Sequence, residues 1–175
     1  MSEQITQVPW KERFSLRFFT IMILIWVLDM LTKYWALGAL GSGKTISVIG
    51  DLLVFRLVYN TGGVFGTFQG NPFIFHVLTG IAIVFLLLYY AKTPDYSTTF
   101  SIAISFVLGG ALGNFTDRFF RPGVVDFIDM GIGSYRWPTY NLADAFISIG
   151  AVLLLFSFAK EAKQAEKVKT NHEKS

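Results

Sequence analysis

The side chains that could do chemistry in this chain gather between Gly109 and Asp144, with apolar sequence on both sides. Ionisable groups at or near membrane depth are costly, so they indicate a functional site by default. Asp126 and Asp144 fall in this stretch, and two carboxylates in contact share one proton because both cannot ionise cheaply. One can then activate a water as general base while the other donates to a scissile carbonyl. The pair therefore predicts amide hydrolysis that needs neither a metal nor a covalent intermediate.

Other kinds of catalytic centre fit the sequence less well. Cysteine is absent, which excludes a Cys nucleophile, a disulfide framework and a Cys-based metal site. The two histidines, His76 and His172, fall in an apolar segment and in the charged tail. We expect no metal and no cofactor. The simpler interpretation of the two aspartates is an interfacial carboxylate and a helix-cap acid, and Asp129 is the best rival for a place in the pair.

The composition is that of a membrane protein. Of the 175 residues, 53% are hydrophobic and 15% are charged, whereas a soluble domain carries about 25% charged residues. One span takes about 20 apolar residues, so a single domain of this length has room for about four spans. Nucleic acid is not an expected partner, because the basic residues flank apolar segments instead of forming a stripe with aromatics.

Apolar segments predict four membrane-spanning helices, at residues 16–37, 72–91, 98–115 and 141–159. The first segment is longer than the apolar core of a signal peptide, and its second half carries charged residues. We therefore interpret it as an uncleaved transmembrane helix.

Two outer loops separate the predicted spans. Residues 38–71 are rich in β-branched side chains and predict two or three short strands. Residues 116–140 predict a second loop, irregular or β-like. The predicted fold class is a mainly α membrane domain over residues 1–160, with four transmembrane helices, a small β-rich extracytoplasmic platform and a second periplasmic loop. A charged cytoplasmic tail follows at residues 161–175.

The placement of lysine and arginine predicts the orientation of the chain. They dominate near the N-terminus, in the turn at residues 92–97 and in the tail, which share one side if there are four spans. On the opposite side the basic residues are mixed with acids. We therefore expect both termini in the cytoplasm and the polar site at the outer face.

Several polar residues are spaced so that they could support the aspartate pair. Asn114 and Arg118 lie four residues apart, on one face if the third helix continues that far. Asn141 is a plausible N-cap of the fourth helix, with Asp144 in its first turn. Asn60 begins a glycine-rich turn whose backbone can approach a ligand closely.

Asp29 and Lys33 share one face of the first span at a spacing of i, i+4. They either support the site or form an ion pair that only positions the helix, and both interpretations stay open. The glycines from Gly109 to Gly113 form a small-residue pattern typical of close helix packing. We interpret Asp117 as a loop acid that makes local hydrogen bonds or pairs with an arginine.

Five short motifs occur in order along the chain: D-x-x-T-K at 29–33, N-x-G-x-x-F-G at 60–66, G-N-x-x-D-R at 113–118, V-V-D-F at 124–127 and N-x-A-D at 141–144. On these motifs the sequence resembles the lipoprotein signal peptidase (signal peptidase II) family, aspartic proteases of bacterial membranes. Each motif alone is weak, but five in the family's order span most of the chain.

The resemblance implies that Asp126 and Asp144 are the catalytic dyad. It implies a diacylglyceryl-modified prolipoprotein as substrate, cut just before the lipidated cysteine, and inhibition by globomycin. It also implies the bacterial cytoplasmic (inner) membrane as location, contact with membrane lipid, no cofactor and a monomer. The residues implied to support the site or the substrate are Asp29, Lys33, Asn60, Gly113, Asn114, Arg118 and Asn141.

The chain departs from the family's usual residues at Met30 and at Gly63-Val64, away from the two aspartates. Two other functions are open at this stage: a non-enzymatic polytopic protein that binds lipid or a partner for assembly, and a small ion or proton carrier. A carrier needs polar groups at several depths, whereas here they collect at one end, which favours an enzyme. Residues 131–140 and 60–70 are candidate loops for closing over a substrate.

Overall fold

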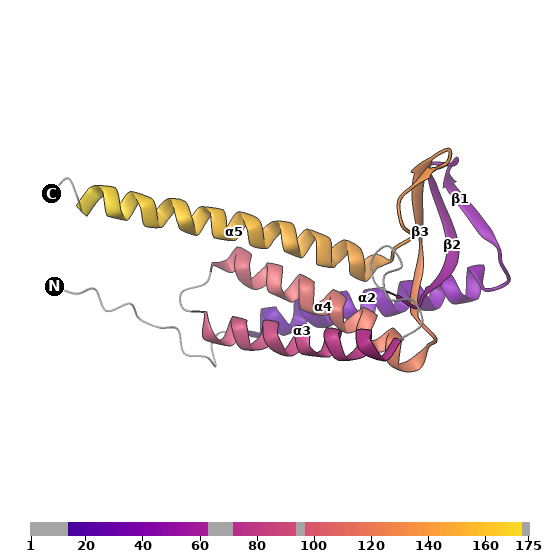
Figure 1. Ribbon diagram of the computed structural model, residues 1–175, viewed down its shortest axis with the longest axis horizontal. Coiled ribbons are helices and arrows are strands. Elements are labelled where there is room, and N and C mark those ends of the chain that lie inside the picture. The colour runs from indigo at the N-terminus through magenta and orange to yellow at the C-terminus, as the bar shows by residue number, and fades with distance from the viewer. Residues whose placement is uncertain (1–13, 63–71, 94–96, 173–175) are drawn as a thin grey trace.

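The computed structural model describes residues 14–62, 72–93 and 97–172. Helices lie side by side, and an antiparallel sheet stands at one end of the bundle with its strands running across the helix axes (Figure 1). The helices are α2 (Leu16–Leu40), α3 (Pro72–Lys92), α4 (Thr98–Phe120) and α5 (Leu142–His172). The strands are β1 (Thr45–Ile49), β2 (Leu53–Asn60), β3 (Val124–Ile132) and β4 (Tyr135–Arg136).

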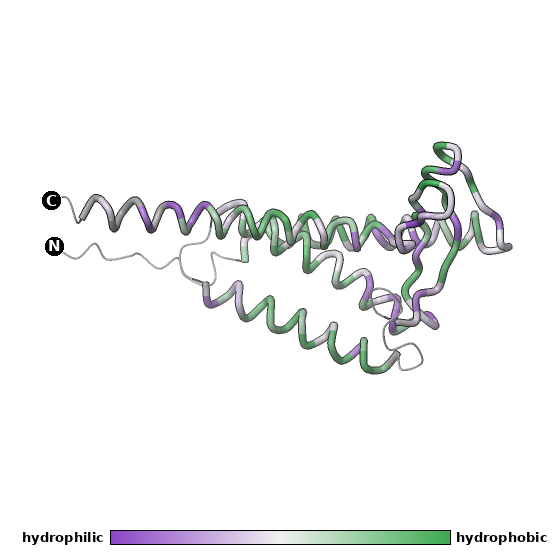
Figure 2. The backbone as a smooth tube through the Cα atoms, turned by 45° about the horizontal axis from the view of Figure 1, so that its top comes forward, coloured by the Kyte–Doolittle hydropathy of each residue, from purple (hydrophilic) through white to green (hydrophobic). Residues whose placement is uncertain are grey.

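The helices carry apolar residues along their middle sections, and hydrophilic residues concentrate at the sheet end and in the last turns of α5 (Figure 2). Three of the described helical stretches are long and apolar enough to cross a membrane: Phe73–Lys92, Thr98–Phe120 and Leu142–Lys163. The predicted membrane-type, mainly helical fold with a small antiparallel sheet is thus confirmed. Helix α2 has 25 residues but is not among the three, and the count of four spans stays a prediction.

Helix α4 lies at the centre of the bundle and packs against α2, α3 and α5. At Gly110 an added Cβ would lie 2.5 Å from the Ala143 carbonyl oxygen, so only glycine lets α4 and α5 approach this closely. At the end away from the sheet, aromatic rings fill the core, with Phe18 and Tyr90 stacked at a centroid distance of 4.6 Å. This aromatic packing joins α2, α3 and α4 at the end of the bundle opposite the polar residues.

The sheet has the order β1-β2-β3-β4, with every neighbouring pair antiparallel. The β2–β3 register places Val58 opposite Asp126 and Asn60 opposite Val124. Ala36 and Leu40 in the last turns of α2 pack against Phe127 of β3. This apolar contact holds the sheet on the bundle and sets the position of the residue before Phe127, which is Asp126.

Two predictions for the outer loops need correction. The segment 116–140 was predicted to be irregular or β-like, and the β-like form is confirmed by β3 and β4. It is not separate from the first outer segment, because β3 pairs with β2 in the same sheet, and its first residues belong to α4, which continues to Phe120. The first helix ends at Leu40 rather than at residue 37, because its last turn buries Leu40 against the sheet. Among the described residues, 38–71 contribute two strands, within the predicted two or three.

Candidate active site

Asn141 and Asp144 cap the N-terminus of α5 through two reciprocal hydrogen bonds. The Asp144 backbone N–H donates to Asn141 Oδ1 at 2.9 Å, and the Asn141 backbone N–H donates to Asp144 Oδ2 at 3.2 Å. This is a capping box, which satisfies backbone donors that a helix start leaves unpaired. The predicted N-cap is confirmed, and the cap fixes the Asp144 carboxylate at the sheet end of the bundle.

Asp126 lies on β3 with 1% of its surface exposed. Its Oδ2 accepts a hydrogen bond from Asn60 Nδ2 at 3.0 Å, across the β2–β3 ladder. Its Oδ1 accepts from Asn141 Nδ2 at 2.8 Å. Because both oxygens face amide donors, the carboxyl group is held in one orientation by the strand before it and the helix after it.

Asn114 of α4 connects the two aspartates to the rest of the bundle. Its Nδ2 donates to Asp144 Oδ1 at 2.8 Å. Its Oδ1 accepts from Asn141 Nδ2 at 3.0 Å and from Lys33 Nζ at 2.9 Å. The lysine can only donate, which forces the Asn114 amide nitrogen toward Asp144.

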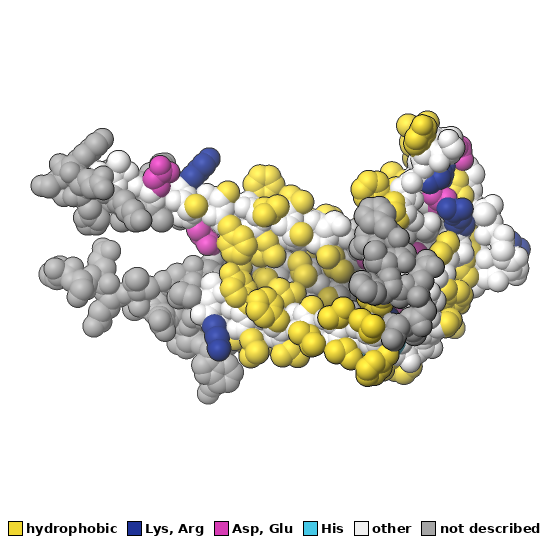
Figure 3. All heavy atoms as spheres, in the orientation of Figure 1, with side chains coloured by type: hydrophobic (Ala, Val, Ile, Leu, Met, Phe, Trp, Pro, Cys, Tyr) yellow, Lys and Arg dark blue, Asp and Glu magenta, His cyan; other side chains and the backbone are white. Residues whose placement is uncertain are grey.

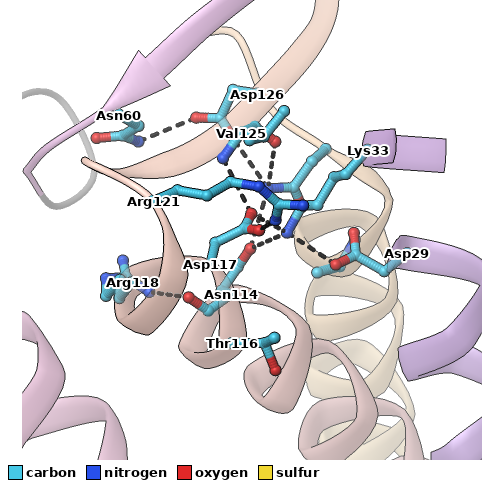
Figure 4. Close-up of polar contacts among 12 residues, drawn as sticks. Asp29, Lys33, Asn60, Asn114, Thr116, Asp117, Arg118, Arg121, Val125 and Asp126 are labelled. Carbon is cyan, nitrogen blue, oxygen red and sulfur yellow. Dashed lines mark hydrogen bonds and ion pairs between the residues drawn. The ribbon is translucent and has the colours of Figure 1, made fainter. Parts of the chain in front are cut away.

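A buried cluster of charges lies behind these amides (Figure 4). Lys33 Nζ is 2.7 Å from Asp29 Oδ2 and 2.9 Å from Asp117 Oδ2, and all three side chains are fully buried. Arg121 pairs with the other oxygen of Asp117. Two acids and two bases thus neutralise one another, which is the condition for burying charge at tolerable cost.

Asp117 was wrongly interpreted from the sequence as a loop acid, because α4 continues past it and buries it. Its pairing with an arginine is confirmed. Its Oδ2 also accepts from the Val125 backbone N–H at 3.0 Å, one residue before Asp126. Sequence reasoning missed this role, although Asp117 lies inside the G-N-x-x-D-R motif and four residues before Arg121.

Asp29 links α2 to the start of α5, because its Oδ1 accepts from the Ala143 backbone N–H at 2.9 Å. The carboxylate reaches that position past Gly113 of α4. A Cβ at Gly113 would lie directly against Asp29 Oδ2. The structure therefore brings Asp29, Lys33 and Gly113 to the same cluster, which is linked to Asp144 through Asn114.

A cleft of about 490 Å³ opens in front of the two aspartates. Arg118 lies at its wall, where Nη1 donates to the Asn114 carbonyl at 3.1 Å and the guanidinium sits 5.8 Å from the centre of the Phe75 ring. Helix α4 continues past Arg118, so Asn114 and Arg118 lie on one helix at a spacing of i, i+4. The lining residues are Asn60, Gly62, Phe75, Asn114, Arg118, Val124, Asp126, Trp137, Pro138, Thr139, Tyr140, Asp144, Ile147 and Ser148.

Parts of both candidate closing loops line the cleft. Residues 137–140, from the segment predicted as 131–140, line the cleft. Of the segment 60–70, Asn60 and Gly62 line the cleft, while residues 63–70, including the Gly63-Val64 departure, lie outside the described residues.

The surroundings of Asp126 favour its neutral form. The pKa of this carboxyl is raised from 3.8 to about 7, chiefly by burial and in addition by the nearby charge of Asp144. Hydrogen bonds from Asn60 and Asn141 and the positive charge of Lys33 oppose this rise. A carboxyl group with a pKa near 7 can hold a proton at neutral pH, which general acid catalysis requires.

Asp129, the rival for the pair, is placed differently. It lies three residues after Asp126 on one strand, so the two side chains point to opposite faces. Asp129 Oδ1 pairs with Arg136 at 3.0 Å and its Oδ2 pairs with Arg56 at 2.8 Å. Both of its oxygens are thus taken up by arginines outside the cleft. Over the described ranges, no group of three His, Cys, Asp or Glu side chains could hold a metal ion.

Fold and site together define a membrane enzyme with a polar cleft at one end of a helix bundle. Two solved structures described as bacterial membrane enzymes have this fold. One gives a TM-score of 0.79 at 31% sequence identity, covering 86% of this chain and 92% of that one. The other gives 0.74 at 32% identity, covering 83% and 94%.

The sequence comparisons give the family. Residues 21–160 match the family described as Signal peptidase (SPase) II. The lipoprotein signal peptidase of Clostridium novyi (strain NT) is 36% identical over 146 residues, covering 82% of this chain and 99% of that protein. That of Halalkalibacterium halodurans is 30% identical over 152 residues, covering 87% and 97%. The chain belongs to the signal peptidase II family and is therefore a peptidase, which sets aside the non-enzymatic and carrier alternatives.

Proposed function

We propose that this protein removes the signal peptide from diacylglyceryl-modified prolipoproteins by cutting before the lipidated cysteine. The family and the names of its relatives support a lipoprotein signal peptidase. The observation that carries the chemistry is that Asp126 and Asp144 line one cleft and are joined through the side chains of Asn114 and Asn141.

In the proposed reaction Asp126 carries a proton and Asp144 does not. Asp144 takes a proton from a water in the cleft, and the water oxygen attacks the scissile carbonyl carbon. Asp126 gives its proton to the carbonyl oxygen, which forms a neutral tetrahedral intermediate. When the carbon–nitrogen bond breaks, the proton on Asp144 passes to the leaving amine and Asp126 recovers its own. Burial of Asp126 supports this division of roles because it favours the protonated form.

The polar residues around the dyad have supporting roles in this proposal. Asn60, Asn114 and Asn141 orient the two carboxyl groups through their amide donors. Arg118 lines the cleft, where its guanidinium N–H groups can bind backbone carbonyls or a lipid phosphate of the substrate. Behind them the cluster of Asp29, Lys33, Asp117 and Arg121 fixes the helices and the Asn114 amide, and Gly113 leaves room for it.

In the proposed placement the protein has four spans, which are the three long apolar helices and α2. The sheet lies at the outer face of a bacterial cytoplasmic membrane. Helix α2 begins and α5 ends at the side of the bundle away from the sheet (Figure 1), which agrees with both termini in the cytoplasm. The buried ion pairs of Asp29 and Lys33 explain how α2 can carry charge at depth. We expect the enzyme to work as a monomer.

The proposal is tested with a prolipoprotein bearing a diacylglyceryl group on its cysteine. The purified protein in detergent should cut the peptide bond directly before that cysteine, so that the cysteine becomes the first residue of one product, as read by mass spectrometry of both products. The matched control is the same polypeptide with an unmodified cysteine, which should not be cut. Globomycin should block the reaction. Equal cleavage of the two substrates, or cleavage elsewhere, would contradict the proposed specificity.

A further inference from the structure

The two β-hairpins end side by side and expose large apolar side chains. The β1–β2 hairpin turns at Gly50 and the β3–β4 hairpin turns at Gly133, both with positive φ. The Gly131 N–H donates to the Leu52 carbonyl at 3.0 Å, which joins the two ends. We call the exposed hydrophobic residues there the hairpin-tip patch: Ile49, Leu52, Ile132 and Tyr135, with 56%, 44%, 77% and 87% of their surfaces exposed.

The hairpin-tip patch lies beside the bundle and not above it. The strands run across the helix axes, and the joined hairpin ends project past α5 (Figure 1); the same projection is visible in the turned view (Figure 2). Hydrophobic side chains gather at this projecting end (Figure 3). If the helices span a bilayer, this end of the sheet overhangs lipid rather than protein.

Charged groups at the tip are paired with one another. Arg136 lies 3.0 Å from Asp129 Oδ1 and 3.2 Å from Asp51 Oδ1, and it also donates to the Asp51 carbonyl at 2.5 Å. A free charge would oppose entry into the membrane interface, whereas paired groups oppose it less. The tip therefore combines four exposed apolar side chains with internally paired charges.

The surface between the tip and α5 is also apolar. A second cleft of about 530 Å³ lies there and adjoins the active-site cleft, because Trp137, Tyr140, Asp144 and Ser148 line both. Its remaining lining is apolar: Met130 on the sheet side, and Ala145 and Ile149 on α5. Trp137 is 66% exposed, and tryptophan and tyrosine are the residues most typical of membrane interfaces. The hydrophobic surface continues along α5 through Val152, Leu155 and Phe156, which are 49%, 69% and 65% exposed.

We propose that the hairpin-tip patch inserts into the lipid interface of the leaflet on the sheet side of the membrane. Lipid is the occupant that fits, because the patch is continuous with the lipid-facing surface of α5 and lies over the bilayer that the helices imply. The insertion makes the tip a second membrane anchor, which holds β3, and with it Asp126, at a fixed height above the helices. This anchoring is independent of the reaction proposed above.

The test uses the absence of native cysteine in the chain. Single variants Ile132→Cys and Leu52→Cys, one on each hairpin, are labelled with a nitroxide in the full-length protein. The labelled proteins are placed in liposomes of phosphatidylethanolamine and phosphatidylglycerol. Lys44→Cys is the matched control, because Lys44 is exposed and precedes Thr45, at the opposite end of the β1–β2 hairpin from the tip. Collisions with oxygen, which concentrates in lipid, are compared with collisions with a water-soluble nickel chelate.

The proposal predicts that oxygen accessibility exceeds nickel accessibility several-fold at both tip positions and that the ratio is reversed at Lys44→Cys. A nickel-dominated signal at either tip position would place the tip in water and overturn the proposal. Low accessibility to both reagents would mean that protein covers the patch, for example a second copy of the chain, and would overturn it as well. Because the substituted side chains are exposed, the labels should leave the unfolding temperature in detergent unchanged, and only variants that meet this condition are compared.

Discussion

Replacing Lys33 by methionine should destabilise the protein strongly, because it leaves two buried carboxylates with one cation. Lys33 Nζ contacts Asp29 at 2.7 Å and Asp117 at 2.9 Å, with no side-chain exposure. Arg121 stays paired with Asp117, so Asp29 becomes the uncompensated charge. Removing one partner of a buried pair costs about 3–5 kcal/mol. For a chain of this length, Lys33→Met should lower the unfolding temperature by roughly 6–20 °C.

A second substitution separates charge imbalance from lost packing. Lys33→Met with Asp29→Asn restores neutrality, and the asparagine oxygen can still accept from the Ala143 N–H. Replacing both partners of a buried pair is often close to neutral. The double variant should therefore recover more than half of the loss in unfolding temperature. Lys44→Met, at an exposed lysine, is the control and should change nothing.

The assay is thermal unfolding of the purified variants in one detergent, followed by scanning fluorimetry. The reasoning is refuted if the double variant is as unstable as Lys33→Met, since charge imbalance would then not be the cause. It is also refuted if Lys33→Met unfolds at the wild-type temperature.

The remaining predictions concern the pH dependence and one glycine. Because the pKa of Asp126 is raised from 3.8 to about 7 and the proposed reaction needs its proton, kcat should fall as the pH rises through about 7. Asn60→Ala removes a hydrogen bond that lowers this pKa, so the alkaline limb of the pH–rate profile should move to higher pH; a shift to lower pH would contradict the assignment. Gly113→Ala places a methyl group against the Asp29 carboxylate and should cost about 1–3 kcal/mol of stability, whereas Gly38→Ala, with no atom within 4 Å, should be neutral or stabilising by about 0.5–1 kcal/mol. Equal unfolding temperatures for the two alanine variants would refute the packing argument.

The local features of the site were predictable from the sequence. The capping box of Asn141 and Asp144 depends on residues three apart, and the meeting of Asn114 and Arg118 depends on residues four apart on one helix. Such contacts follow from helix periodicity alone. The apolar segments likewise predicted the helices, because long hydrophobic runs leave few alternatives in a membrane.

The contacts between residues far apart in the chain could not be predicted from the sequence in the same way. The burial of Asp117 depends on Lys33, which lies on another helix, and on the Val125 N–H of β3. The pairing of β3 with β2 depends on a register across 66 residues that joins Asn60 to Asp126. Neither contact follows from a helix or strand periodicity in the sequence. For this reason residues 116–140 were predicted as a separate loop.

The claim that Asp126 and Asp144 perform the cleavage is tested most directly by turnover of a diacylglyceryl-modified prolipoprotein. Wild type, Asp126→Asn and Asp144→Asn are compared in detergent with EDTA present, and Asp51→Asn, at a side chain that is 71% exposed, serves as the control. We predict that wild type and the control cut the substrate at equal rates, and that each dyad variant stays folded but loses cleavage. Substantial cleavage by both dyad variants would contradict the account.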